Sequence, residues 1–335
     1  MVLSTILFTG CKKKNETPDG PPSDSLRLGM SYTAWWHDGY LSPPSDSSLE
    51  ILKLDNVNWV AVLVTWYQDS TTATQIYRDT LLTPNDQSIR HVIAYAKNLG
   101  RKIMLKPHVD CKIGWRGEIV PDSFGEWFRS YKQFITHYAK IAESLACEQF
   151  CVGTELEGTT LDHESDWRTI IDSVRVLFHG VITYAANWDK YRDYVPFWDY
   201  VDIVGIDAFF PLTNSNNPTL NDLINSWNSR WVAEIEDFQD NIKKPILFTE
   251  IGYRSLDGAN TQPWNWQITG TVDTAEQRDC YQAAFDALMD KPWFRGFFWW
   301  NWTTDPNQGG PTDENYTPHN KPAERILKQW YQLNS

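Results

Sequence analysis

Two glutamates stand at the ends of apolar segments, and carboxyl groups in such positions can perform acid–base and nucleophilic chemistry. Glu155 follows residues 149–154, Glu250 follows residues 245–249, and a threonine precedes each glutamate. Such a pair can cleave a glycosidic bond when one carboxyl group protonates the leaving oxygen and the other, ionised, attacks the anomeric carbon. Mutual repulsion would raise the pKa of the proton donor, so that the pair holds one proton near neutral pH. We therefore predict that Glu155 and Glu250 form a catalytic pair.

Aromatic residues are unusually frequent in this chain. It has 18 Trp, 15 Tyr and 15 Phe, which together make up 14% of its residues. Hydrophobic cores are built mainly from Leu, Ile and Val, whereas planar aromatic faces also stack on sugar rings. The composition is compatible with a carbohydrate substrate and equally with an aromatic-rich core. Trp35 and Trp36 stand just after an apolar segment, so their position makes them candidate sugar platforms.

Eight apolar segments are candidate strands that would position these residues. They are hydrophobic without alternation, as parallel strands buried on both faces are. The segments are residues 28–34, 59–65, 103–109, 149–155, 181–187, 201–207, 245–250 and 296–301. Helical periodicity lies between them, at residues 86–99, 124–145, 165–177, 220–241, 274–289 and 322–332, with weaker candidates at 45–54 and 189–194.

Strand and helix candidates alternate along the chain, and this order predicts the fold. Eight β-then-α units favour an α/β protein, a (β/α)8 TIM barrel, over two doubly wound domains. We expect one catalytic domain over residues 27–335. Active residues of such barrels lie at the carboxyl ends of the strands, which is where Glu155 and Glu250 stand, together with His108, Asn187 and Asp207.

Charge and hydropathy exclude several classes of protein. The formal net charge of −13 argues against a nucleic-acid partner, because phosphate neutralisation needs clustered Lys and Arg. No apolar run approaches the roughly 18–20 residues that span a bilayer, so a polytopic membrane protein is excluded.

The first residues resemble a bacterial lipoprotein signal. The apolar residues 2–9 lead to Gly10 and Cys11, so residues 1–11 would end at a cysteine that is lipidated. Residues 12–26 then read as a flexible linker, because Pro, Ser, Asp and Lys cannot bury a core. The pattern predicts export and a lipid anchor in the cell envelope, periplasmic or at the cell surface, with no other membrane contact.

The remaining cysteines are Cys111, Cys147, Cys151 and Cys280. Their spacing fits no zinc site. Two alternatives stay open, buried thiols or one disulfide bond.

Four motifs resemble the clan A glycoside hydrolases and, within the clan, family 113, the β-mannanases. These motifs are residues 152–157 (VGTELE), 248–253 (FTEIGY), 106–108 (KPH) and 298–301 (FWWN). The resemblance implies that Glu155 is the acid/base, that Glu250 is the nucleophile and that Trp299 lines the −1 sugar subsite. It also implies that His108 and Asn187 contact the sugar or orient the nucleophile.

One position departs from the clan pattern. A tyrosine after the sixth strand often donates a hydrogen bond to the nucleophile in this clan, but the stretch 207–210 reads Asp-Ala-Phe-Phe. A phenylalanine cannot donate that bond, so Tyr253 or another group would have to do so.

The resemblance as a whole implies a retaining endo-β-1,4-mannanase. Such an enzyme would act on a polysaccharide or oligosaccharide without a metal ion or organic cofactor, and we expect a monomer. Two alternatives remain from the residues themselves. One is a non-catalytic, surface glycan-binding lipoprotein that uses the aromatic residues alone. The other is a metal-dependent barrel enzyme in which Glu155, Asp207 and Glu250 hold Mg²⁺.

Overall fold

A computed structural model describes residues 25–334 of the chain. The expected lipoprotein signal with Cys11, and residues 12–24 of the expected linker, lie outside the described residues.

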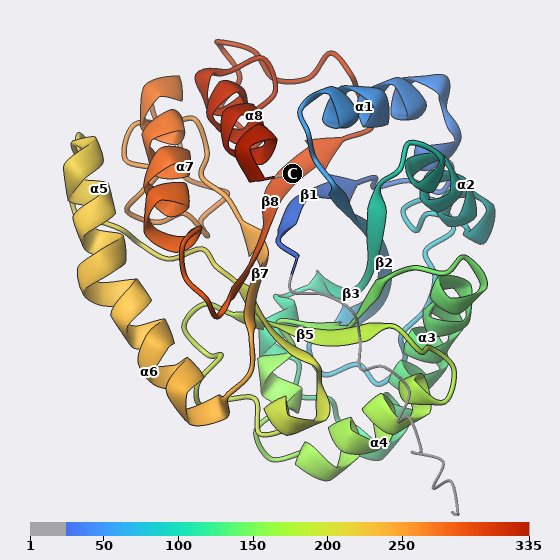
Figure 1. Ribbon diagram of the computed structural model, residues 1–335. Helices are drawn as coiled ribbons and strands as arrows, with labels where there is room; N and C mark the ends of the chain where they lie inside the picture. Colours follow the sequence, from blue (N-terminus) through green and yellow to red (C-terminus); the bar gives the residue numbers. More distant parts are fainter. Residues whose placement is uncertain (1–24, 335) are drawn as a thin grey trace, which may run out of the picture.

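Eight parallel strands close into a barrel in which each strand pairs with the next along the chain and β8 pairs with β1 (Figure 1). The strands are β1 (Arg27–Thr33), β2 (Trp59–Ser70), β3 (Lys102–Ile113), β4 (Gln149–Thr154), β5 (Val181–Asn187), β6 (Ile203–Asp207), β7 (Ile246–Ile251) and β8 (Phe294–Thr303). The predicted (β/α)8 barrel is confirmed, as a single domain.

Helices surround the barrel on its outside (Figure 1). They are α1 (Pro43–Leu54), α2 (Asp86–Asn98), α3 (Phe124–Ser144), α4 (Glu164–Arg175), α5 (Leu220–Ser226), α6 (Ala233–Ile242), α7 (Thr274–Leu288) and α8 (Pro322–Asn334). Short polar side chains cap several of their first turns. Asn85, Ser123 and Asp273, for example, accept hydrogen bonds from backbone N–H groups of α2, α3 and α7. Such caps satisfy donors that have no partner inside the helix.

Apolar residues on both faces of the strands explain why the strand sequences are continuously hydrophobic. In β2, Val60, Val62 and Val64 belong to the core shared with the surrounding helices. The alternating residues Trp59, Ala61 and Leu63 belong to a smaller cluster made of strand residues, which fills the inside of the barrel.

The helical layer differs from the sequence prediction in two places. The helix predicted over residues 220–241 is interrupted by a π-helical turn, Trp227–Val232, between α5 and α6. The helix predicted over residues 189–194 is instead a series of turns, and a 3₁₀ turn, Trp198–Tyr200, is the helical element between β5 and β6. Pro196 prevents these turns from continuing as a helix, because proline lacks the N–H group that a continuing helix requires.

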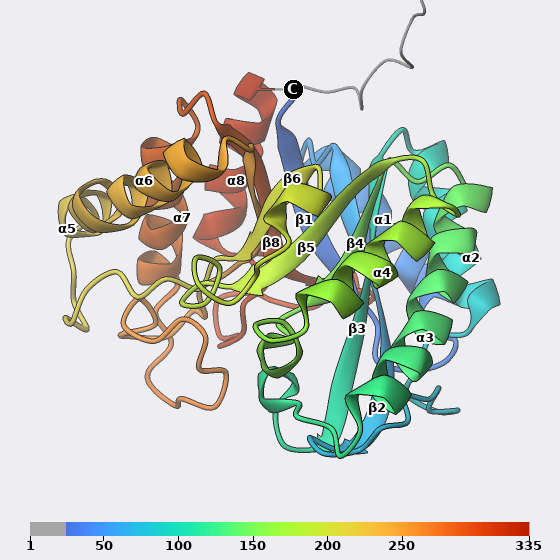
Figure 2. The same cartoon turned by 90° about the horizontal axis from the view of Figure 1, so that it is seen from below.

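Strands β2 and β3 are longer than predicted and matter for the site. Each has 12 residues, and they stay paired up to Ser70 and Ile113. Figure 2 shows them extending past the ends of the other strands, on one side of the barrel mouth. Their outer halves carry polar residues such as Gln68, Asp69 and Asp110, which is why an apolar pattern did not reveal them.

Two further observations concern the helices and the cysteines. Within residues 25–334, none of the helices combines the length and the apolar character needed to cross a bilayer. Cys111, Cys147, Cys151 and Cys280 are free thiols, so the structure favours the thiol alternative over a disulfide among these four.

Candidate active site

A cavity of about 1200 Å³ lies at the carboxyl ends of the strands. Both Glu155 and Glu250 line it, so the structure brings the two predicted catalytic residues to one site. Their neighbours on the cavity wall are aromatic and polar, and include Trp35, Asp110, Trp115, Arg116, Asn187, Trp188, Phe209, Trp264, Trp266, Trp300, Asn301 and Tyr316.

Glu155 follows the last residue of β4 in an uncommon backbone conformation. Its φ is 52°, in the left-handed region that costs a residue with a Cβ atom roughly 1 kcal/mol or more. The backbone N–H group of Glu155 donates to the Ala185 carbonyl oxygen at 2.8 Å, which fixes the turn. The side chain then points to the cavity, where Glu155 Oε2 accepts a hydrogen bond from Arg116 Nη1 at 3.3 Å.

Glu250 lies within β7, and a buried lysine donates a hydrogen bond to its side chain. Lys106 Nζ, from β3, donates to Glu250 Oε1 at 2.5 Å. The same ammonium group donates to both carboxylate oxygens of Asp207, at 3.1 and 3.2 Å. Thr249 Oγ1 donates to Asp207 Oδ1 at 2.8 Å. Three strands therefore meet in one buried network beneath the cavity.

Burial and neighbouring charge determine the protonation of the two glutamates. Burial, followed by repulsion from Asp207, raises the pKa of Glu155, against an opposing effect of Arg116. Burial and Asp207 likewise raise the pKa of Glu250, against an opposing effect of Lys106. The pair can therefore hold a proton at a pH where an exposed carboxyl group has none.

The two raised pKa values, about 7 for Glu155 and about 8 for Glu250, are close, so the contacts decide the assignment. Lys106 Nζ lies 2.5 Å from Glu250 Oε1, whereas Arg116 Nη1 lies 3.3 Å from Glu155 Oε2 and Arg116 also donates to Asp110. We therefore assign the ionised form to Glu250 and the proton to Glu155.

Lys106 itself is charged in this setting. Burial alone would lower its pKa, but the carboxylates of Asp207 and Glu250 outweigh burial and raise it. The ammonium group thus lies between Asp207 and Glu250, where a metal ion bound by these two carboxylates would have to lie. These two residues were the proposed ligands, with Glu155, of a metal-dependent enzyme. Because the position is filled by a lysine, the geometry does not support that alternative.

The other predicted polar residues lie in different relations to the cavity. Asn187, the last residue of β5, lines it. His108 is buried just behind Glu250, with its Nε2 atom 3.7 Å from Glu250 Oε1. Burial, reinforced by Arg116 and Lys106, lowers the pKa of His108 well below its usual range, so its imidazole is neutral. Tyr253 is fully buried, and its hydroxyl group has no hydrogen-bond partner among residues 25–334. It neither donates to Glu250 nor lines the cavity, so the prediction that it supplies the hydrogen bond to the nucleophile or contacts the substrate is wrong.

The tryptophans of β8 require a correction. Trp299 is fully buried and stacks on Tyr281 of α7, with ring centroids 3.6 Å apart. It cannot contact a sugar in this position, so its expected place in the −1 subsite is wrong. Trp300 lines the cavity instead, beside Trp35 at a centroid distance of 6.4 Å. The physical reason is that successive side chains of a strand point to opposite faces. Trp36 is 50% exposed and lies outside the residues that line the cavity.

Several residues of the site were not predicted from the sequence. Asp110 and Arg116 come from the extension of β3 and the turn after it, and Arg116 Nε and Nη2 both donate to Asp110 Oδ1, at 2.8 and 2.6 Å. Trp264 and Trp266 come from the β7–α7 loop, and Trp264 stacks on Trp188 at 5.2 Å. The signal available in the sequence was the presence of large aromatic residues in loops, where burial does not require them.

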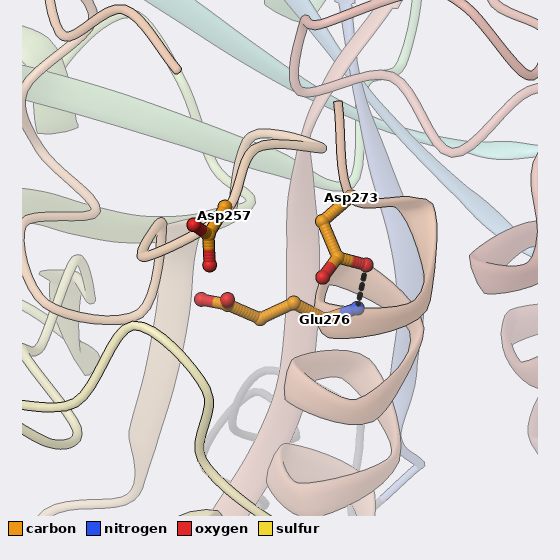
Figure 3. Close-up of side chains that lie close together, drawn as sticks. All are labelled: Asp257, Asp273 and Glu276. Carbon is orange, nitrogen blue, oxygen red and sulfur yellow. Dashed lines mark hydrogen bonds between the residues drawn. The ribbon is translucent and has the colours of Figure 1, made fainter. Parts of the chain in front are cut away.

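Three carboxylates at the base of the β7–α7 loop give this segment its shape (Figure 3). Ligand-type oxygens of Asp257, Asp273 and Glu276 lie within 4.8 Å of one another. Glu276 accepts hydrogen bonds from the backbone N–H groups of Gly258 and Asn260, at 2.8 and 2.9 Å, and Asp273 caps α7. These contacts secure the loop that carries Trp264 and Trp266.

A (β/α)8 barrel with a glutamate after β4 and a second one in β7, both on one aromatic cavity, is the arrangement of a glycoside hydrolase. The comparisons with known proteins agree. The sequence model of Glycoside Hydrolase Family 113 matches residues 30–321. The chain belongs to this family, as the four motifs indicated.

Solved structures of the same family are similar to this chain. The GH113 β-mannanase of Alicyclobacillus acidocaldarius, in complex with ManMIm, is 30% identical, with a TM-score of 0.84 over 93% of this chain and 98% of that chain. A complex of a GH113 β-1,4-mannanase is 30% identical, with a TM-score of 0.84 over 92% of this chain and 99% of that chain. No curated protein matches the sequence.

The β-glucuronidase of Ruminococcus gnavus shares the fold alone. It is 11% identical, with a TM-score of 0.59 over 92% of this chain and 50% of that chain.

Proposed function

We propose that the protein is a retaining endo-β-1,4-mannanase that cleaves mannan-type polysaccharides or oligosaccharides. The observation that carries the proposal is the position of Glu155 and Glu250 on one cavity, with Glu250 bound to a charged lysine. The mannan substrate is supported by the similarity to two GH113 β-mannanase structures over more than nine-tenths of the chain.

In the first step, a glycosyl-enzyme forms. A carboxylate oxygen of Glu250 attacks the anomeric carbon, and the bond between that carbon and the leaving oxygen breaks. Glu155 gives its proton to the leaving oxygen, so that a neutral hydroxyl departs. The raised pKa of Glu155 supplies this proton near neutral pH.

In the second step, water releases the sugar. Glu155 is now ionised and takes a proton from a water molecule, whose oxygen bonds to the anomeric carbon as the ester bond to Glu250 breaks. Two inversions at the same carbon give net retention. The hydrogen bond from Arg116 to Glu155 favours the ionised form that this step needs.

The dimensions of the cavity support action on a chain of sugars. Its volume of about 1200 Å³ exceeds the roughly 300–1,000 Å³ that suits a drug-sized ligand. Trp35 and Trp300 on one wall, and Trp188 with Trp264 on another, offer separate aromatic faces for sugar rings. This arrangement supports internal cleavage.

A decisive experiment compares products on defined manno-oligosaccharides and cello-oligosaccharides, with the product anomer followed by proton NMR. We expect cleavage of the manno-oligosaccharides with retention, and loss of turnover in Glu250→Ala. Glu143→Gln is the matched control, because Glu143 forms an exposed pair with His179 away from the site. Binding to mannan without release of new reducing ends would favour a non-catalytic glycan-binding lipoprotein instead.

We also propose that Cys11 carries a lipid that anchors the enzyme in the cell envelope. The support is the sequence pattern of residues 1–11 and the Pro/Ser/Asp-containing segment that follows. The test is fractionation of cells that express the full chain. We expect the wild type in the membrane fraction and Cys11→Ala in the soluble fraction, and equal partition of the two would contradict the anchor.

A further inference from the structure

We propose that Lys106 is the positioning residue of the nucleophile: it holds Glu250 Oε1 in a fixed place and keeps Glu250 ionised while Glu155 keeps its proton. The inference rests on the proposed role of Glu250 and deepens it. It also answers the question left by Phe209, which lines the cavity but has no group to donate a hydrogen bond.

The hydrogen-bonding capacity of Lys106 is fully used. An ammonium group has three donors, and Lys106 Nζ has three acceptors, which are Glu250 Oε1 and the two oxygens of Asp207. Its side chain is 0% exposed. A buried lysine is costly unless it is paired and hydrogen-bonded, so this geometry leaves it no alternative position.

Asp207 fixes the lysine from the opposite side. It ends β6, is fully buried, and also accepts from Thr249, the residue before Glu250. Its negative charge balances Lys106, and without Lys106 it would lie uncompensated beside Glu250. Lys106 and Asp207 therefore act as one unit, in which the lysine supplies both the charge and the contact with the nucleophile.

Other groups around Glu250 do not provide that contact. His108 is neutral, and its Nε2 atom has no hydrogen-bond partner within the described part of the chain. The hydroxyl group of Tyr316 donates to the Pro263 carbonyl oxygen at 2.8 Å. Arg116 donates to Asp110 and Glu155. Among the residues that the structure describes, Lys106 is thus the side chain that donates to Glu250.

The contact has a direct consequence for the reaction. Because Lys106 binds Oε1, Oε2 is the oxygen left to attack the anomeric carbon. Preorganised donors of this kind act without reorganisation during the reaction. Removing one such donor costs on the order of 100-fold in rate, and removing an opposite charge in contact shifts a carboxyl pKa upward by about 1–3 units.

The test uses the full enzyme and three variants. In Lys106→Met, we expect kcat on manno-oligosaccharides to fall on the order of 100-fold, and the acidic limb of the kcat/KM profile to rise by about 1–3 pH units. Lys106→Arg keeps the charge, so its acidic limb should stay near that of the wild type. Lys97→Met, which breaks a pair with Glu148 away from the cavity, controls for the loss of a partly buried lysine.

A double variant covers the case in which Lys106→Met does not fold. Lys106→Met with Asp207→Asn removes one positive and one negative charge, so the net charge of the buried cluster is unchanged, and we expect this variant to fold and still lose on the order of 100-fold in kcat. A folded double variant with wild-type kcat, or a Lys106→Met variant with an unchanged acidic limb, would overturn the proposal.

A second measurement separates this inference from the proposed function. Carbon-13 NMR of labelled glutamate side chains, assigned with Glu250→Gln, follows the ionisation of Glu250 without substrate. A higher midpoint in Lys106→Met supports the role of Lys106 even if no mannan is cleaved, in which case the mannanase proposal alone fails. An unchanged midpoint in an active enzyme removes the role of Lys106 and leaves the mannanase proposal intact.

Discussion

The ion pair between Arg116 and Asp110 gives a prediction with a sign that can be worked out in advance. Arg116 Nη1 lies 3.3 Å from Glu155 Oε2, and Asp110 Oδ1 lies 2.6 Å from Arg116 Nη2. The arginine favours the ionised form of Glu155, whereas the aspartate opposes it. The basic limb of the pH–rate profile marks the pH at which Glu155 loses its proton. Replacing Arg116 should move this limb to higher pH, and replacing Asp110 should move it to lower pH.

The expected size follows from the distance. Two unit charges 3.3 Å apart attract by about 5 kcal/mol at an effective dielectric constant of about 20. Asp110 offsets part of this attraction, so we expect a shift at the lower end of the roughly 1–3 pKa units that a nearby opposite charge produces, that is, about one unit, or about 1.4 kcal/mol. In Arg116→Met, the pKa of Glu155 rises and the basic limb moves up. In Asp110→Asn, the pKa falls and the limb moves down.

The assay is kcat/KM on a soluble manno-oligosaccharide from acidic to alkaline pH, with folding checked by circular dichroism at each end. Arg129→Met is the control, because Arg129 pairs with Glu126 on the surface of α3. A basic limb that stays in place in Arg116→Met, or that moves down, would refute the electrostatic reasoning. An equal shift of the basic limb in Arg129→Met would show that the shift does not depend on the contact between Arg116 and Glu155.

Three further predictions concern stability and the aromatic residues. The folded-state pKa of Glu155 is raised above 4.5 by burial and Asp207, so the stability contributed by its protonated form is present below about pH 4.5 and is lost as pH rises through the raised pKa. At about pH 9, the free energy of unfolding of Glu155→Gln should therefore exceed that of the wild type by on the order of 2 kcal/mol, measured by denaturant unfolding. Near pH 4 the two should be equally stable. Equal stability at both pH values would contradict the raised pKa. Trp300→Ala should raise KM with little change in melting temperature, whereas Trp299→Ala, which leaves a hole against Tyr281, should cost about 3–5 kcal/mol of unfolding free energy; the reverse pattern would restore Trp299 to the sugar site. Glu276→Gln should lower the free energy of unfolding by about 1–3 kcal/mol. It should also raise KM, because the loop that carries Trp264 loses hydrogen bonds that hold it in place. An unchanged KM would show that the position of this loop does not affect substrate binding.

The barrel could be predicted because its signals are local. Strands buried on both faces read as continuous apolar runs, and helices between them have their own period, so the order of elements followed from the sequence. The positions of Glu155 and Glu250 followed from the same rule, because strand ends meet at one mouth of a parallel barrel. The extension of β2 and β3 could not be predicted, since its residues are polar and owe their strand conformation to pairing with each other.

Side-chain register was the main source of error at the site. Trp299 and Trp300 are identical neighbours in β8, and only the pleat of the folded strand decides which one faces the cavity. The sequence offered Tyr253 as a hydrogen-bond donor to Glu250, but its side chain is fully buried in the hydrophobic core. The pairing of Lys106 with Asp207 joins residues 101 positions apart, and Arg116 reaches Glu155 from a turn whose position depends on the extended strand. Such contacts arise from tertiary packing and leave no local pattern.

The most direct test of the account is to trap the covalent intermediate. A 2-deoxy-2-fluoro mannosyl donor with a good leaving group slows release of the sugar, and mass spectrometry of the digested protein then locates the attached sugar. We expect a glycosyl ester on the peptide that contains Glu250, absent in Glu250→Ala and formed more slowly in Lys106→Met. A sugar attached to a different residue, or hydrolysis that proceeds with inversion and without a trapped ester, would contradict it.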